Sequence, residues 1–286
     1  MLTEKLALGT VQFGLDYGIS NKSGKTNREE AHKILNYCYL NGINLIDTAR
    51  TYGNSEEVIG TFKPLDFSIV TKFLIDSDYP SLQLNLESSL QRLDTSTLYA
   101  FMAHDAEQFR IYPLLWDDLQ KLKSEGKVQK IGYSLYYPKQ LQQLLDKGKI
   151  PDIVQVPYNI FDKRFESLFP QLKEIGCEIH TRSAFLQGLF FMNIDLLSEH
   201  FEPIKIYLKE LQHLFKQKEE LAAYLLKFCL NNIYIDKVLF AVNSLEQLKT
   251  NLKELAIASS LNLGDIYKNI IVPESILIPS NWPVKQ

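Results

Sequence analysis

The stretch INLIDTARTYGNSEEVIG, from Ile43 to Gly60, reads as a buried strand that runs directly into a helix. Its first residues, 43–46, are mostly apolar and predict a short strand that ends at the carboxylate of Asp47. A loop carrying Tyr52 follows, and Ser55 is expected to cap the helix after it. One acid and one phenol therefore stand where a strand meets a helix, the edge at which alternating strand–helix barrels carry their chemistry.

The same alternation of short apolar strands with segments of helical spacing continues along the chain. The expected strands are residues 6–8, 43–46, 67–70, 98–102, 128–131, 153–156, 177–179 and 238–240. Eight such units in 286 residues predict the α/β class and a closed (β/α)8 TIM barrel. An open doubly wound sheet is the alternative, and the lack of a glycine-rich fingerprint after the first strand weakens it.

The whole chain, residues 1–286, is expected to form one barrel domain, with residues 256–286 as a C-terminal tail that packs on its surface. Residues 201–230 are helical in period and predict one long helix or two shorter ones. Thr26 and Glu29 have the spacing of a capping box at the start of an early helix. The capping box is preferred over a phosphate loop at the SGKT of residues 23–26, because Ile19 stands where that motif needs glycine.

Composition limits the partners. A formal net charge of −3 without a basic run gives no footprint for nucleic acid or an anionic membrane. No apolar segment has the length of a membrane span, and the opening MLTEKLALGT lacks the run of a signal peptide, so we expect a cytoplasmic protein. Cys38, Cys177 and Cys229 are too scattered for a disulfide framework or a zinc site. The oligomeric state is not readable.

Ionisable residues end three consecutive strands. Asp47, Lys72 and His104 close the second, third and fourth, so the three side chains are expected side by side at the barrel mouth, with Tyr52 above them. A buried ammonium needs a carboxylate, and an ammonium beside a phenol favours the phenolate. We therefore expect Asp47 to keep Lys72 charged, Lys72 to lower the pKa of Tyr52, and His104 to hydrogen-bond a substrate carbonyl. No metal is expected, because the histidines form no ligand cluster.

The sequence resembles the aldo-keto reductase superfamily. The matching segments are LALGTVQFGLDYG, IDTARTYGNSEEVIG, SIVTKF, MAHD, VQVPYN, RSAFLQGLF and VNSLEQLKTN, in that order. The first and the sixth look most like a bacterial branch associated with surface-sugar pathways. The resemblance implies carbonyl reduction by NADPH bound without a Rossmann unit, with Asp47, Tyr52, Lys72 and His104 as the catalytic tetrad and Tyr52 as general acid.

The resemblance also implies a set of cofactor contacts. These are Ser134, Gln155, Arg182, Asn243, Ser244, Gln247 and Asn251. Two departures stand out, because Leu135 replaces a usual asparagine and Ala241 a usual glycine or lysine. Lys249 is the only cation between residues 241 and 251. NADH is therefore a possible cofactor too, and we expect the chain to distinguish NADPH from NADH less sharply than a typical member of the family.

The leading hypothesis is an NADPH-dependent reductase of a small-molecule aldehyde, ketone or sugar-derived carbonyl. A second is a cofactor-binding barrel with little turnover that acts as a sensor or protein partner, suggested by Leu135 and Ala241. A third is an isomerase or lyase that uses Lys72 covalently. The substrate is not readable from the sequence, and loops 15–25, 105–110 and 190–202 are expected to shape its pocket.

Overall fold

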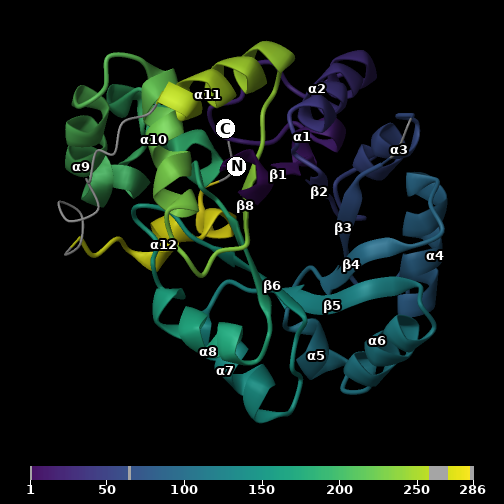
Figure 1. The fold of residues 1–286 in the computed structure, drawn as a ribbon. Helices are drawn as coiled ribbons and strands as arrows, with labels where there is room; N and C mark the ends of the chain where they lie inside the picture. Colours follow the sequence, from purple (N-terminus) through teal and green to yellow (C-terminus); the bar gives the residue numbers. More distant parts are fainter. Residues whose placement is uncertain (1, 64–65, 258–269, 284–286) are drawn as a thin grey trace.

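The computed structural model describes residues 2–63, 66–257 and 270–283, which fold around a closed barrel of eight strands (Figure 1). Every strand is parallel to its neighbours, and the last pairs with the first. The strands are β1 Leu6–Gly9, β2 Leu45–Asp47, β3 Ser68–Phe73, β4 Leu98–Ala103, β5 Val128–Ser134, β6 Ile153–Pro157, β7 Glu178–Arg182 and β8 Lys237–Phe240. The predicted (β/α)8 barrel is confirmed, and the doubly wound alternative is wrong because the sheet closes on itself.

All eight expected strands are present, with shifted ends. Three strands, β3, β5 and β7, continue three residues past their predicted ends, and the extension of β3 beyond Val70 makes Lys72 part of the strand. The register pairs Asp47 with Val70 and Lys72 with Met102. These parallel pairings carry the C-terminal ends of neighbouring strands to one rim of the barrel, where the ionisable side chains meet.

Helices surround the barrel and follow the apolar spacing of the sequence. They are α1 Val11–Gly14, α2 Arg28–Leu40, α3 Ser55–Gly60, α4 Leu82–Leu93, α5 Gln108–Ile111, α6 Leu115–Ser124, α7 Pro138–Asp146, α8 Phe169–Glu174, α9 Glu202–His213, α10 Lys218–Leu230, α11 Leu245–Ile257 and α12 Glu274–Leu277. Residues 201–230 thus contain two helices, the second of the two alternatives. Short 3-10 turns include Leu186–Phe191, which follows β7.

Two predicted helix caps are wrong by one residue. Helix α2 is capped by Asn27, whose side-chain oxygen accepts from the backbone N–H of Glu30 at 2.9 Å, so Thr26 forms no capping box with Glu29. Helix α3 starts after Asn54, and Ser55 is its first helical residue. The Ser55 hydroxyl donates instead to the backbone oxygen of Thr10 at 2.9 Å, because the side chain is fully buried and needs a hydrogen-bond partner.

A second apolar cluster lies beside the main core. It joins the 3-10 turn after β7 to α9, α10 and the C-terminal segment, whose Ile276 and Leu277 are buried in it (Figure 1). Residues 270–283 of the expected surface tail therefore pack against these elements, while residues 258–269 and 284–286 lie outside the described part of the chain. Within the described ranges, no helix is long and apolar enough to cross a membrane, and no three His, Cys, Asp or Glu side chains gather as metal ligands.

Candidate active site

A buried ion pair lies beneath the barrel mouth. Lys72 Nζ donates to Asp47 Oδ1 at 2.6 Å and to the backbone oxygen of Thr48 at 3.0 Å. The side chains of Lys72 and Asp47 are 1% and 4% exposed. Burial lowers the pKa of Lys72, and the Asp47 carboxylate opposes that shift. The separation is that of a charge-assisted hydrogen bond.

The other oxygen of Asp47 is also satisfied. Gln155, in the middle of β6, donates from Nε2 to Asp47 Oδ2 at 2.7 Å. The backbone oxygen of Asp47 accepts from the hydroxyl of Thr10 at 3.0 Å. Gln155 comes from β6 and Thr10 from the residue after β1. The amide fixes the Asp47 carboxylate and the hydroxyl fixes its backbone, so Asp47 is positioned to bind Lys72.

Tight backbone packing positions Tyr52. An added Cβ at Gly14, the last residue of α1, would lie 1.7 Å from the backbone oxygen of Tyr52. Gly53 has a φ of +55°, a left-handed conformation that glycine adopts without a steric cost. These two glycines let the loop after β2 turn closely under α1, and that turn places the phenol at the mouth.

Tyr52 and His104 meet at that mouth. Their rings contact edge to face with centroids 5.5 Å apart, and Lys72 Nζ lies 5.3 Å from the Tyr52 ring centroid. The Nδ1 atom of His104 is 2.9 Å from the hydroxyl of Thr51. The four residues predicted from the strand ends are therefore brought together, and Thr51 is a partner that the sequence did not indicate.

The pKa values of these groups depart from the expectation. Burial, with the Asp47 carboxylate adding to it, raises the pKa of Tyr52 above that of a free phenol. The prediction that Lys72 lowers this pKa is wrong: the net shift is upward, and the positive charge that opposes it is Arg182, not Lys72. Burial and the positive charges of Lys72 and Arg182 lower the pKa of His104 to about 3, so its imidazole is neutral at pH 7.

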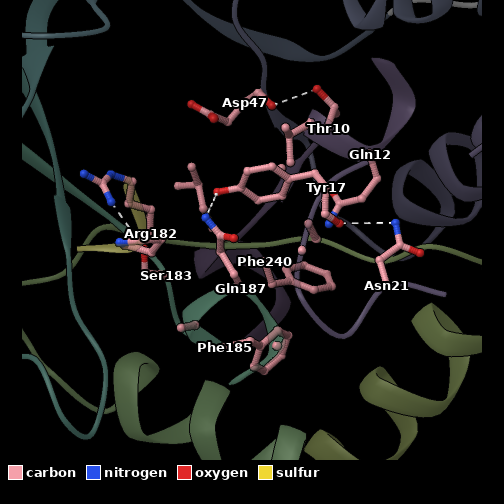
Figure 2. Close-up of a pocket in the computed structure, with 18 of the residues that line it drawn as sticks. Thr10, Gln12, Tyr17, Asn21, Asp47, Arg182, Ser183, Phe185, Gln187 and Phe240 are labelled. Atoms are coloured by element: carbon pink, nitrogen blue, oxygen red, sulfur yellow. Dashed lines mark hydrogen bonds between the residues drawn. The ribbon is translucent and has the colours of Figure 1, made fainter. Parts of the chain in front are cut away.

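A cavity of about 430 Å³ opens from this group (Figure 2). It falls within the size range of small-molecule sites, roughly 300–1,000 Å³. Its walls come from the strand ends, the loop after β1, the turn after β7 and the residues before α11. The polar or charged lining side chains are Thr10, Gln12, Tyr17, Ser20, Asn21, Asp47, Tyr52, His104, Ser134, Tyr136, Gln155, Arg182, Ser183, Gln187, Asn243, Gln247 and Ser280.

Three predicted cofactor residues line the cavity: Ser134 and Arg182, which end β5 and β7, and Gln155 in the middle of β6. The guanidinium of Arg182 stacks over the Tyr136 ring at 4.3 Å and donates to the backbone oxygen of Leu135 at 3.0 Å. The Leu135 side chain is buried in the main core instead of facing the cavity. Its carbonyl therefore contributes to the site by anchoring Arg182.

The other four predicted cofactor residues lie at the start of α11. Asn243 and Gln247 line the cavity. Ser244 accepts from the backbone N–H of Gln247 at 3.1 Å, so it begins the helix instead of lining the cavity. Asn251 lies further along α11, is 3% exposed and does not line the cavity either.

Two lysines, one in α11 and one in β8, are engaged away from the cavity. Lys249 lies over the Tyr37 ring, with 5.8 Å between Nζ and the ring centroid. Lys237 begins β8 at the opposite end of that strand from the cavity, and it donates to the backbone oxygen of Glu4.

Sequence reasoning missed part of the cavity wall. Gln187 donates from Nε2 to the Tyr17 hydroxyl at 2.9 Å, joining the loop after β1 to the turn after β7 (Figure 2). Tyr17 falls in the predicted loop 15–25, whereas Gln187 precedes the predicted loop 190–202, which contributes only Phe191. Loop 105–110 contributes no residue to the lining. Polar residues inside the segment RSAFLQGLF were the available signal.

Unpaired polar atoms show that the cavity suits an extended polar ligand. Within the described chain, Gln12 Oε1 and Asn243 Oδ1, both from lining residues, are buried without a hydrogen-bond partner, as is Asn251 Nδ2 in α11. Such groups are costly unless a ligand or water satisfies them. The same cavity reaches Tyr52 and His104 and also Asn243 and Gln247, so a long molecule bound along it would contact both ends. The residues present therefore fit a nicotinamide dinucleotide.

Comparison with known proteins agrees with this geometry. Residues 5–261 match the family model described as "Aldo/keto reductase family". The uncharacterized oxidoreductase YqkF of Bacillus subtilis is 25% identical over 92% of this chain and 98% of its own. The NADH-specific methylglyoxal reductase of Escherichia coli is 28% identical over 65% of this chain and 64% of its own. The fold resembles an aldo-keto reductase of Bacillus halodurans in its holo form, with a TM-score of 0.73, 22% identity, and coverage of 94% of this chain and 92% of that one.

Proposed function

Because this chain belongs to the aldo/keto reductase family of oxidoreductases, we propose that it reduces an aldehyde, ketone or sugar-derived carbonyl to an alcohol. The supporting observation is the edge-to-face contact of Tyr52 and His104 at the cavity wall, directly in front of the buried Lys72–Asp47 pair. An acid, a neutral imidazole and a shielded charge pair converge on one wall, as proton transfer to a carbonyl oxygen requires.

In this proposal Tyr52 supplies the proton. A reduced nicotinamide dinucleotide provides the hydride when it is bound. The raised pKa of Tyr52 keeps the phenol protonated before reaction, so the proton is present when negative charge develops on the carbonyl oxygen. An alkoxide is a far stronger base than a phenolate, so the transfer is downhill. The ammonium of Lys72, 5.3 Å from the ring centroid, then stabilises the phenolate that remains.

His104 orients the carbonyl. With a pKa near 3 it is uncharged at neutral pH and acts as a hydrogen-bond donor without competing for the proton. A Thr51 hydroxyl that donates to Nδ1 leaves the ring proton on Nε2, the nitrogen available to a ligand in the cavity. Thr51 is therefore a positioning residue for His104.

The cofactor is proposed to lie between two groups of residues. Ser134, Gln155 and Arg182 would hold the nicotinamide end, since they line the cavity beside the Tyr52 wall. Asn243 and Gln247 would hold the adenosine end at the start of α11. The resemblance implies NADPH with NADH as the alternative, and the adenosine end of the site determines which of them binds.

The substrate is proposed to be small and polar. Hydroxyl, amide and guanidinium groups of Tyr17, Gln187 and Arg182 face the cavity. Two relatives are named for the reduction of small dicarbonyls, as methylglyoxal reductase and glyoxal reductase. Methylglyoxal, glyoxal and a set of sugar aldehydes therefore form the first panel to assay.

The Tyr52→Phe variant tests the proposal. We expect it to abolish carbonyl reduction while cofactor affinity stays within about threefold of the parent, because only the proton donor is removed. Reduction at the parental rate would remove Tyr52 from the mechanism. Borohydride treatment with substrate serves as a control, because a trapped adduct on Lys72 would instead support covalent chemistry at that lysine.

A further inference from the structure

A carboxylate from a distant part of the chain occupies the start of α11. Glu30, in the first turn of α2, accepts from the backbone N–H of Leu245 at 2.7 Å, and Leu245 is the first residue of α11. The Thr26 hydroxyl donates to the backbone oxygen of Asn243 at 3.2 Å, which ties the same loop to the cavity wall. The contact therefore lies beside Asn243 and Gln247, where the proposed adenosine end is held.

The charge of Glu30 is only partly compensated. Its cationic neighbour is Lys33, whose Nζ is 3.9 Å from Glu30 Oε2 but only 2.8 Å from Glu29 Oε1. Lys249, the only cation of the loop 241–251, lies over Tyr37 instead. The Glu30 side chain is 27% exposed, so its carboxylate faces both the helix start and the solvent.

The start of a long helix is a favourable place for an anion, because its first N–H groups lack partners and the helix dipole is positive there. In this chain Glu30 already fills that place. A phosphate on the adenosine ribose would lie against a carboxylate and lose a backbone donor. A ribose with free hydroxyls would instead be favoured beside Glu30, since its hydroxyls can donate to the carboxylate.

We propose that Glu30 makes this protein select NADH over NADPH. The inference rests on the proposed function, because it needs a dinucleotide whose adenosine end lies at the start of α11. The missing basic residues predicted only that NADPH and NADH would be distinguished weakly. The position of Glu30 predicts more, namely that NADH binds more tightly than NADPH. Asn243 Oδ1, which lines the cavity and is buried without a partner among the described residues, is a further polar contact open to the same ligand.

Direct binding tests the proposal without any turnover. Calorimetric titration of the parent with NADH and NADPH at low salt should give at least about tenfold tighter binding of NADH. Glu30→Gln keeps an acceptor for the Leu245 N–H and removes the charge. The ratio of the NADPH to the NADH dissociation constant should therefore fall by about tenfold, mainly through tighter NADPH binding. Higher salt should narrow the parental ratio, because it screens the repulsion.

Glu29→Gln is the matched control. It removes the same charge one residue away, from a side chain that is 81% exposed and paired with Lys33. Because it leaves the Glu30 carboxylate in place, it should change the ratio of the two dissociation constants far less than Glu30→Gln does. Tighter binding of NADPH by the parent, or an identical ratio in Glu30→Gln, would overturn the inference and leave Glu30 as a helix cap alone. Failure of both cofactors to bind would overturn the proposed function itself.

Discussion

Replacing Lys72 by methionine should destabilise the fold as well as abolish reduction. The substitution keeps most of the side-chain volume but leaves the Asp47 carboxylate buried, with its 2.6 Å ammonium partner gone and only the Gln155 amide remaining on its side-chain oxygens. Breaking a buried pair in this way costs about 3–5 kcal/mol. For a chain of this size that loss corresponds to a fall in Tm of roughly 5–15 °C.

Differential scanning calorimetry of three proteins checks the reasoning. They are the parent, Lys72→Met, and Lys72→Met combined with Asp47→Asn, in which a neutral amide replaces the stranded carboxylate. The double variant should recover at least half of the lost Tm while remaining inactive, because the uncompensated charge is the source of the cost. A Tm for Lys72→Met within about 1 °C of the parent would refute the buried placement of the pair. A double variant no better than the single one would show that lost packing, not charge, is responsible.

Two further predictions concern His104 and its partner. The pKa of His104 is lowered to about 3, so the unfolded chain binds its proton more readily than the folded protein does. The contribution of neutral His104 to the free energy of unfolding is therefore complete above about pH 6.5 and is lost as the pH falls toward 3. Chemical denaturation should accordingly show that His104→Leu loses about 1–2 kcal/mol less stability than the parent between pH 7 and pH 5, and equal losses would contradict the shift. Thr51→Val should lower kcat about tenfold with cofactor affinity unchanged, whereas Thr51→Ser, which restores the hydroxyl on His104 Nδ1, should recover it. An equal loss in both variants would assign Thr51 a packing role only.

Local sequence patterns predicted much of the fold. Apolar runs with a period of two or 3.6 depend on neighbouring residues alone, so the eight strands were readable. The same period left residues 201–230 open between one helix and two, and the structure contains two. Helix caps were less certain, because several polar residues compete at each start. The side chain of Asn27 caps α2 where Thr26 was expected, and Ser55 donates to Thr10 instead of capping α3.

By itself, the sequence determined that Asp47, Lys72 and His104 end consecutive strands, and strand order alone brings such residues to one rim. Only the tertiary structure decided what these groups contact and how they ionise. Gln155 reaches Asp47 across the barrel, and burial, not the lysine, sets the direction of the Tyr52 pKa. Glu30 reaches the start of α11 from a helix more than 200 positions away. Such contacts form only when the barrel closes and β8 pairs with β1. Neither the number of residues between two side chains nor the local apolar period predicts how close they lie in the folded protein.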